Sequence, residues 1–487
     1  MASDGSSKLL VAMVGLPARG KSYISNKLVN YFTWQGSSVG VFNVGKARRA
    51  EGSEEATADS KQSADFFAKD NKEAAAYREA LAMGVLGTAL EWVLDQPTEQ
   101  TIAIFDATNT TFDRRAAVVK YVHDFNMSRS DNEEVSLLFV ESVCTDKDVI
   151  RNNMLQKISS SMDYKHMAQD TALEDLARRM KNYEQVYQEL QEDEDVSYIK
   201  VMNIAKKVEA ALITGSMQLL MLGYLVSIHL AARPVWLVRS GNASAETGKR
   251  RATLHLQSSS VKSLLSDDHE PSVGVADVDL TGFDAGRGKA SQRLTPEGKA
   301  FAAALADEIV KRSDGQSVSI LTSTTLSSKQ TVNPLVERLG SNCQVRGLRA
   351  LNTFDMGSKE QLLEALSKPE EKAAFLQDRF RYRCPGGESF EDLVRRLHPV
   401  VLHIERSKAP VVVVSHLVPL RTLAGYFTGQ KIPLSSDDFD VPEHAIVELV
   451  PQGGGWSSKV MQITQPVQDA LCSPKRSPKK SKRSQAC

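Results

Sequence analysis

Residues 8–23 read KLLVAMVGLPARGKSY: an apolar run, a glycine, four residues and then Gly-Lys-Ser. This spacing is typical of a phosphate-binding loop, in which a buried strand ends in a loop whose backbone N–H groups surround a polyphosphate at a helix N-terminus. The matching positions are Gly15, Gly20, Lys21 and Ser22. We expect Lys21 to reach the β- and γ-phosphates and the Ser22 hydroxyl to ligand Mg²⁺. The simpler alternative is a glycine-containing strand-to-helix turn.

The sequence around the loop fits this interpretation. Residues 9–14 indicate a buried parallel strand, and residues 23–34 have the apolar spacing of the following helix. A second buried strand is predicted at residues 38–44, with Arg48 and Arg49 just beyond it. That edge is where open α/β sheets bind ligands, so the two arginines are candidate anion-binding groups.

Composition sets the limits for the whole chain. Its 487 residues are enough for two or three domains, and its formal net charge of zero gives no electrostatic case for a nucleic-acid or anionic-membrane partner. The apolar residues 217–232 are too short for a membrane span and contain His229, so we expect a core helix. Five scattered cysteines and an N-terminus without a signal pattern predict reduced thiols in a cytoplasmic protein.

Residues 101–109, TIAIFDATN, form the second strong motif. A buried strand that ends in Asp106, after the crossover from a phosphate loop, is typical of the carboxylate that holds Mg²⁺. The alternative role, a helix N-cap, suits Asp113 better. Further elements are predicted as follows: a loop or lid at 51–72, a helix at 71–94, a strand at 135–144 and an amphipathic helix at 170–190. The alternation of strand and helix predicts a doubly wound, mostly parallel α/β domain of the P-loop kinase type.

Other motifs in the chain distinguish among the classes of phosphate-loop protein, which include GTPases, ATPase motors and small-molecule kinases. The chain has no guanine-reading Asn-Lys-x-Asp at a strand end, which argues against a GTPase. Arginines instead gather at the ends of elements, at Arg48, Arg78, Arg114 and Arg179. Guanidinium groups suit a second phosphorylated ligand, so the residues indicate phosphoryl transfer to a small phosphate-bearing acceptor.

GLPARGKSY, FNVGKARR, FDATNTT and FVESVC occur in an order and spacing that resemble the bifunctional 6-phosphofructo-2-kinase/fructose-2,6-bisphosphatase family. The resemblance continues through residues 179–184, 381–400 and 411–416, and so covers most of the chain. It implies a P-loop kinase domain followed by a histidine-phosphatase domain. It also implies phosphorylation of the 2-hydroxyl of fructose 6-phosphate by ATP and Mg²⁺, and it suggests a homodimer.

The resemblance also implies roles for individual residues. The ATP loop would comprise Gly15, Leu16, Pro17, Ala18, Arg19, Gly20, Lys21, Ser22 and Tyr23, with Asn153 as a further nucleotide contact. The sugar-phosphate set would be Arg48, Arg78, Thr108, Arg114, Arg179 and Tyr183. Asp106 and Cys144 match active-site positions, and Asp106 can serve either as a Mg²⁺ ligand or as acceptor of the 2-hydroxyl proton. Two departures are Ala47 in place of a family tyrosine and Ile158 in place of a family lysine, with Lys157 one position away.

The second half departs from the family at its chemistry. The histidine-phosphatase fold carries Arg-His-Gly after its first strand, whereas this chain has Arg239, Ser240 and Gly241. The family's acidic glutamate aligns with Thr353, and a phosphate-binding arginine aligns with Ser327. Arg239, Glu388 and His416 persist. Since loss of a covalent nucleophile can cost about 10⁶ in rate, we expect a phosphatase-shaped domain without phosphatase activity.

We therefore predict two domains and a tail. The first domain, at residues 1–230, is 6-phosphofructo-2-kinase-like. The second, at residues 231–470, is an inactive phosphatase-like domain with a mobile insertion at 242–292, and residues 471–487 form a basic disordered tail. The last 15 residues carry six Lys or Arg and no acids. Ser473 and Ser477 precede prolines and are candidate phosphorylation sites. Two alternatives stay open: a bifunctional enzyme whose hydrolase uses other residues, and a non-catalytic nucleotide and sugar-phosphate sensor.

Overall fold

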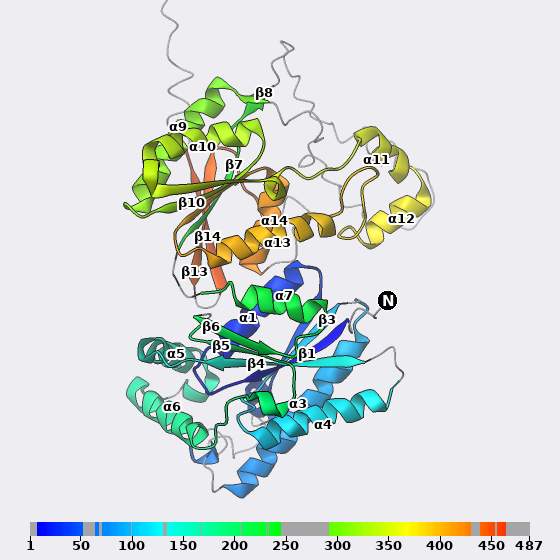
Figure 1. Ribbon diagram of the computed structural model, residues 1–487, viewed down its shortest axis with the longest axis vertical. Coiled ribbons are helices and arrows are strands. Elements are labelled where there is room, and N and C mark those ends of the chain that lie inside the picture. The colour runs from blue at the N-terminus through cyan, green and yellow to red at the C-terminus, as the bar shows by residue number, and fades with distance from the viewer. Residues whose placement is uncertain are drawn as a thin grey trace, which may run out of the picture.

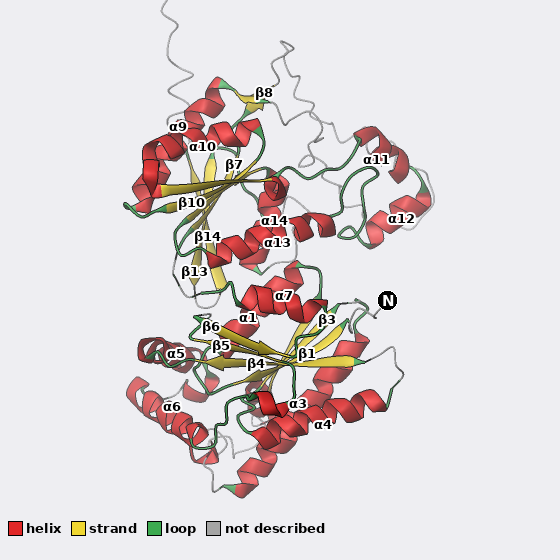
Figure 2. Ribbon diagram, in the orientation of Figure 1, coloured by secondary structure: helices red, strands yellow, loops and turns green. Residues whose placement is uncertain are grey.

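The computed structural model describes residues 7–51, 64–67, 71–98, 100–129, 134–165, 167–204, 206–229, 231, 233–244, 292–429, 439–452 and 455–463. Most of the predicted lid, nearly all of the predicted insertion and the whole tail lie outside the described residues. Two large sheets lie one above the other (Figures 1 and 2).

The first sheet has the strand order β2-β3-β1-β4-β5-β6, and only β6 runs antiparallel to its neighbour. Its strands are β1 (Lys8–Val14), β2 (Ser38–Asn43), β3 (Thr101–Asp106), β4 (Val135–Val143), β5 (Tyr198–Met202) and β6 (Lys207–Ala211). Its helices are α1 (Lys21–Trp34), α2 (Val44–Glu51), α3 (Lys72–Asp95), α4 (Phe112–Met127), α5 (Lys147–Ser160), α6 (Gln169–Glu184) and α7 (Ser216–Leu225). Short 3₁₀ turns are η1 (Ala64–Phe67), η3 (Met162–Tyr164) and η4 (Glu192–Glu194). The predicted doubly wound α/β sheet is confirmed.

Successive side chains of β1 serve the two faces of this sheet. Leu9, Val11 and Met13 pack in the core that contains residues of α1 and α7. Leu10, Ala12 and Val14 pack with α3 and α4 on the other face. Both faces are therefore buried, which explains why the strand reads as a continuous apolar run.

The second sheet has the order β11-β10-β12-β7-β13-β14, with β13 and β14 antiparallel. Its strands are β7 (Val235–Arg239), β10 (Val318–Ser323), β11 (Cys343–Leu348), β12 (Val411–Ser415), β13 (Ala445–Gln452) and β14 (Gly455–Gln462). The helices around it are α9 (Pro296–Ser313), α10 (Leu326–Leu339), α11 (Lys359–Leu366), α12 (Pro369–Gln377), α13 (Phe390–Arg406) and α14 (Leu417–Thr428), with 3₁₀ turns η6 (Gly340–Asn342) and η7 (Arg349–Leu351). A small separate pair is formed by β8 (Ala243–Ser244) and β9 (Arg293–Leu294).

Several predicted elements are corrected by the structure. Strand β2 is half-buried rather than buried, because it lies at the edge of its sheet. The N-cap of α4 is Thr111, whose hydroxyl accepts the amide of Arg114, so the assignment to Asp113 was wrong. The helix predicted at 170–190 ends at Glu184.

The helix predicted at 217–232 is α7, which ends at Leu225. It lies between the two sheets (Figure 1) with Met221 and Tyr224 fully buried. Among the described residues, no helix combines the length and the apolar character that a bilayer crossing requires.

Helix α1, which begins at the phosphate loop, is also the main contact with the second sheet's helices. Lys27 forms a buried ion pair of 2.8 Å with Glu405 of α13. The Trp34 indole N–H donates to the Thr422 carbonyl at 2.7 Å, in α14. One hydrophobic core includes residues from both sheets and from α1, α7, α13 and α14. The helix behind the loop is therefore fixed by both halves of the chain.

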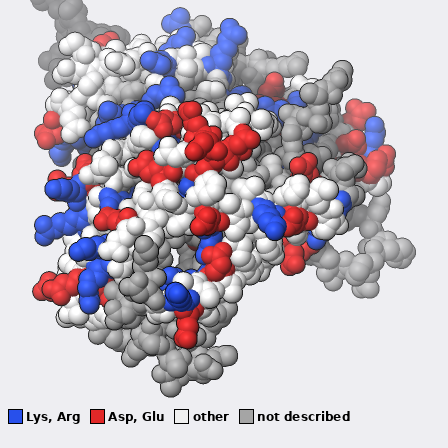
Figure 3. All heavy atoms as spheres, turned by 60° about the horizontal axis from the view of Figure 1, so that its bottom comes forward, with Lys and Arg blue, Asp and Glu red and all other residues white. Residues whose placement is uncertain are grey.

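Charges of both signs are interspersed on the face that carries the first sheet's outer helices (Figure 3), in line with the zero formal net charge of the chain.

Candidate active site

The loop after β1 is shaped by its glycines and holds Lys21 within its curve. Gly15 has a φ of +131°, and a Cβ there would lie 2.6 Å from the Ser142 carbonyl oxygen, so a larger residue would displace the backbone. The Lys21 ammonium donates to the carbonyl oxygens of Gly15 at 2.7 Å and Leu16 at 2.8 Å. The predicted strand-loop-helix arrangement is confirmed.

Three predicted residues from other elements touch this loop. The Gly15 N–H donates to the Thr108 carbonyl at 2.9 Å. The Asn153 amide donates to the Ala18 carbonyl at 3.0 Å. Cys144 is buried, and its carbonyl, not its thiol, accepts a hydrogen bond from Arg19. The structure thus brings Thr108, Asn153 and Cys144 to the loop through contacts that support its shape.

Asp106 ends β3 beside the loop, as predicted. Its carboxylate accepts a hydrogen bond of 2.5 Å from the side-chain amide of Asn43, the residue paired with it on β2. The charge of Asp106 also opposes the lowering of the pKa values of Lys21 and Lys157. The ends of β2 and β3 therefore meet at one carboxylate, whose charge acts on two lysines.

Burial lowers the pKa of both lysines. The pKa of Lys21 falls to about 8, although Asp106 opposes the shift, and Arg179 and Arg19 add to it. The pKa of Lys157 falls to about 7 through burial and then through repulsion by Arg179 and Lys21. Groups with strongly lowered pKa values that gather around one carboxylate mark this as the candidate active site.

A cluster of arginines lies on the other side of this site. Arg48 pairs with Asp163 at 2.7 Å, and Arg49 and Arg179 reach the same carboxylate at 3.5 Å each. Asp163 is 2% exposed at its side chain, and its Oδ1 has no hydrogen-bond partner among the described residues. A buried acid thus compensates part of the charge of three arginines.

Two of these arginines, Arg48 and Arg179, lie over the ring of Phe67, together with Arg78. The guanidinium of Arg179 lies 3.7 Å from its centroid, that of Arg48 5.4 Å and that of Arg78 5.6 Å. The ring of Tyr183 lies 5.8 Å away. A guanidinium group over the face of an aromatic ring is attracted by the negative charge of that face. Four of the six residues predicted for a sugar phosphate therefore share one place.

Two other predicted residues are placed differently. Arg114 forms an ion pair with Glu79, and its charge acts on Arg78, so it lies at the margin of the cluster. Tyr23 turns away from the loop, and its hydroxyl donates to the His229 carbonyl at 3.3 Å. Tyr23 therefore contributes to the contact between the two halves of the chain.

The second predicted site lies at the carboxyl ends of β7, β10 and β12 and is lined by hydroxyl groups. The Ser240 hydroxyl contacts that of Ser328 at 2.5 Å and donates to the Ser415 carbonyl at 3.2 Å. His416 Nε2 lies 3.4 Å from the Ser323 hydroxyl and 3.3 Å from the Thr325 hydroxyl. Ser327 is buried, 3.4 Å from Thr325.

The charged residues near this hydroxyl cluster are held in ion pairs. Arg239 pairs with Glu443 at 3.0 Å. Glu388 accepts from Arg396 at 2.7 Å and from the Asp355 amide at 2.8 Å. Arg396 also donates to the Thr353 carbonyl at 3.2 Å. Glu388 is thus occupied in supporting the loop that carries Thr353.

Comparison with known proteins covers both halves. The 6-phosphofructo-2-kinase family matches residues 1–232, and the histidine phosphatase superfamily (branch 1) matches residues 283–464. The chain is 33% identical over 457 residues to 6-phosphofructo-2-kinase/fructose-2,6-bisphosphatase 1 of Mus musculus, which covers 92% of this chain and 83% of the mouse protein.

The chain belongs to the 6-phosphofructo-2-kinase/fructose-2,6-bisphosphatase family. The Caenorhabditis elegans protein of the same description is 32% identical over 465 residues, or 93% of this chain and 89% of its own. A solved structure, a putative alpha-ribazole-5'-P phosphatase from Escherichia coli, matches 47% of this chain and 96% of its own at 17% identity and a TM-score of 0.32. That match does not bear on function.

One lysine that the 6-phosphofructo-2-kinase/fructose-2,6-bisphosphatase family has near its nucleotide was assigned to the wrong position from the sequence. The sequence placed Ile158 at a family lysine position, but Ile158 packs against the core cluster that contains Leu176 and Tyr164. The charges that act on the pKa of the neighbouring Lys157 include those of Lys21 and Asp106. One residue along a helix turns the side chain by about 100°, so a shift of one position in alignment hides the lysine.

Asp163 and Phe67 were also missed in this 6-phosphofructo-2-kinase domain. Asp163 is one acid in a polar stretch, and only its burial against Arg48 distinguishes it. The sequence did contain one signal for Phe67, which is that residues 66 and 67 are adjacent phenylalanines within a polar segment. Two large apolar side chains in such a segment are expected to pack against other elements, and here they form a buried cluster.

Proposed function

We propose that this chain is an ATP-dependent 6-phosphofructo-2-kinase that makes fructose 2,6-bisphosphate from fructose 6-phosphate, and that its second domain does not hydrolyse the product. The observation that carries the proposal is the position of Lys21, Asp106 and Lys157 next to the arginine cluster around Asp163 and Phe67. It offers one place for a polyphosphate and an adjacent place for a phosphorylated sugar.

In the proposed reaction the 2-hydroxyl oxygen of fructose 6-phosphate forms a bond to the γ-phosphorus of ATP. The bond from that phosphorus to the β–γ bridging oxygen breaks, ADP leaves, and the hydroxyl proton is lost. Lys21 and Lys157 oppose the negative charge on the phosphates, and Arg48, Arg78 and Arg179 hold the 6-phosphate. Catalysis is then mainly positioning and electrostatic stabilisation.

The donors present fit Mg²⁺, which prefers oxygen ligands. Ser22 is the second residue of α1, directly after the loop, and the buried Asp106 is the last residue of β3. Mg²⁺ bound there would neutralise phosphate charge. The Asp106 carboxylate could instead accept the 2-hydroxyl proton, and both roles are compatible with its position.

The loss of hydrolysis is supported by the residues at the second site. A histidine phosphatase needs a histidine nucleophile and an acid for the leaving oxygen. This chain has Ser240 and Thr353 at those positions and Ser327 in place of a phosphate-binding arginine. The Ser240 hydroxyl is bonded to Ser328 and to a carbonyl oxygen, which is a packing role.

The test of the kinase is direct. Purified protein is given Mg-ATP and fructose 6-phosphate, and the product is tested for acid lability and for hydrolysis by an external fructose-2,6-bisphosphatase. An acid-labile product that disappears in Lys21→Met and Asp106→Ala variants supports the proposal. Nucleotide binding without product would exclude it.

A further inference from the structure

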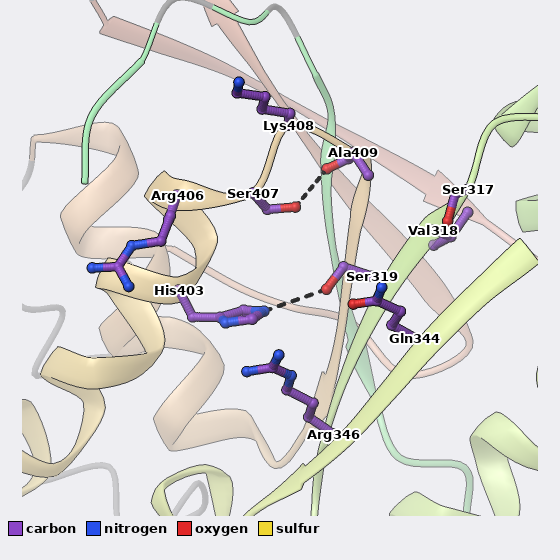
Figure 4. Close-up of a pocket in the computed structure, with 10 residues that line it drawn as sticks. All are labelled: Ser317, Val318, Ser319, Gln344, Arg346, His403, Arg406, Ser407, Lys408 and Ala409. Carbon is purple, nitrogen blue, oxygen red and sulfur yellow. Dashed lines mark hydrogen bonds between the residues drawn. The ribbon is translucent and has the colours of Figure 1, made fainter. Parts of the chain in front are cut away.

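A basic pocket lies at the opposite edge of the second sheet from the hydroxyl cluster. Its volume is about 430 Å³, and it is lined by the starts of β10 and β11 and by the end of α13 with the segment that follows (Figure 4). The lining residues used below are Ser319, Gln344, Arg346, His403, Arg406 and Lys408. Because β7, β10, β11 and β12 are parallel, their starts and ends lie on opposite edges.

The pocket is therefore separate from the site that the family places at the strand ends. Val318 at the pocket and Ser323 at the hydroxyl cluster are the first and last residues of β10, so five residue steps, or about 17 Å of strand, separate them. The phosphate loop follows β1 of the first sheet and contributes no residue to the pocket lining. Nothing described so far uses its residues.

The charge of the pocket is one-sided. Its ten lining residues include two arginines, a lysine and a histidine, and no aspartate or glutamate. The side chains of Arg346 and Lys408 form no hydrogen bond or ion pair with any residue that the structure describes. By contrast, Arg312, Arg338, Arg396 and Arg421 of the same half are all paired with acids. Uncompensated cations that share a concave surface attract an anion.

The side chains of Arg346 and His403 point toward one another across the pocket (Figure 4). His403 Nε2 lies 3.4 Å from the Ser319 hydroxyl. The pKa of His403 is lowered by burial and by the charges of Arg346 and Arg406. An anion between Arg346 and His403 would relieve that repulsion and raise the pKa of the imidazole.

We propose that this pocket binds a small phosphate ester, with its phosphate between Arg346 and His403. A guanidinium group, an imidazole and the Ser319 hydroxyl supply donors of the kind that phosphate oxygens accept. The volume is in the range of small-molecule sites and exceeds what a phosphate alone fills. The remaining space, toward Gln344 and the rim cations Arg406 and Lys408, suits a polar, negatively charged body.

The loop that floors the pocket is fixed to the chain between the two sheets. The Ser407 carbonyl lies 2.7 Å from His229 Nε2, and Arg406 donates to the Ser227 hydroxyl at 3.3 Å. Both partners belong to the segment that follows α7. The pocket wall is thus held in place from outside, which favours a preformed site.

The test uses the full chain labelled at its histidines, with the His403 resonance assigned from a His403→Asn variant. The probes are 3-phosphoglycerate, inorganic phosphate and, as a neutral control, glycerol. We expect 3-phosphoglycerate to shift the His403 resonance saturably and to raise its pKa, inorganic phosphate to bind at least tenfold more weakly, and glycerol to have no effect.

Arg346→Gln should weaken 3-phosphoglycerate binding at least tenfold and leave kinase activity unchanged, because Arg346 lies outside the kinase site. The matched control is Arg349→Gln, which removes a cation three residues along the chain and outside the pocket lining. Equal binding by wild type and Arg346→Gln, equal loss in both variants, or no shift of His403 at 10 mM probe would each overturn the proposal. Equal affinity for inorganic phosphate would overturn the ester specificity.

Discussion

Arg48 and Asp163 form a buried ion pair of 2.7 Å, and this pair fixes the geometry of the arginine cluster beside the phosphate loop. Arg49 and Arg179 share the same carboxylate. Asp163→Asn would leave buried guanidinium groups without a compensating charge, a change that costs roughly 3–5 kcal/mol when one partner of a buried pair is lost. We expect a fall of that size in the free energy of unfolding, measured by denaturant titration.

The same variant should raise KM for fructose 6-phosphate at least tenfold while KM for ATP changes less than threefold, because the displaced arginines are the ones that we propose hold the 6-phosphate. Steady-state kinetics with each substrate varied in turn would measure both values. An equal rise in both KM values would mean that Asp163 only supports the fold.

Arg179 and Arg178 offer a matched comparison on α6. Arg179 stacks on Phe67 and reaches Asp163, whereas the Arg178 side chain is 67% exposed. Arg179→Gln should raise KM for fructose 6-phosphate by about 10- to 100-fold. This is the effect expected from losing one charge-assisted hydrogen bond to phosphate, which contributes roughly 1.5–3 kcal/mol. Arg178→Gln should change it less than twofold. Similar rises in KM in both variants would show that substrate binding depends on the net charge of α6 and not on the position of Arg179.

The lowered pKa values of Lys157 and Lys21 predict an alkaline loss of activity. Each lysine is charged below its pKa and neutral above it, so the free enzyme loses these cations near pH 7 and then near pH 8. Since kcat/KM reports ionisations of the free enzyme, kcat/KM for ATP should fall in two steps over this range. Lys157→Met should remove the first step and keep the second. A profile that stays flat to pH 9.5 would contradict the burial of Lys21.

The ion pair between Lys27 and Glu405 joins the two halves of the chain, and Tyr426 also donates to Glu405 at 2.6 Å. Glu405→Gln should destabilise the protein by about 3 kcal/mol, because Lys27 stays buried and unpaired. The double variant Lys27→Met, Glu405→Met should recover part of that loss.

Unfolding in denaturant measures both variants. The control is Glu391→Gln, which breaks the exposed pair with Arg395 and should cost at most about 0.5 kcal/mol. Equal losses for Glu405→Gln and Glu391→Gln would show that the contact between the halves is not buried in solution.

The sequence predicted the parts of the site that follow local rules. Gly15, Gly20 and Lys21 are fixed by the geometry of one turn, and Asp106 by the end of one buried strand, so both motifs could be read without tertiary information. The helix at 170–190 was predicted too long because Val186, Tyr187 and Leu190 continue an apolar spacing beyond Glu184, where the helix ends. Leu190 is buried, but it lies outside the helix.

Lys157 and Asp163 depend on contacts that the sequence does not show. Lys157 belongs to the site because it lies on α5 where the charge of Arg179 acts on it. Asp163 belongs to the site because Arg48, Arg49 and Arg179 all reach its carboxylate. Thr111 and Asp113 are both possible N-caps of α4, because either side chain can accept a hydrogen bond from a backbone amide of the first turn. The extended backbone at Thr111 makes that residue the cap, and the sequence does not show this backbone conformation.

We expect the chain to make fructose 2,6-bisphosphate and not to hydrolyse it. The most direct test of this expectation follows fructose 2,6-bisphosphate labelled in the 2-phosphate, incubated with the same preparation whose kinase activity has been measured. We expect product formation in the kinase assay, no release of labelled phosphate above the buffer blank, and no label bound to the protein. Release of labelled phosphate that depends on His416 or Arg239 would contradict this expectation.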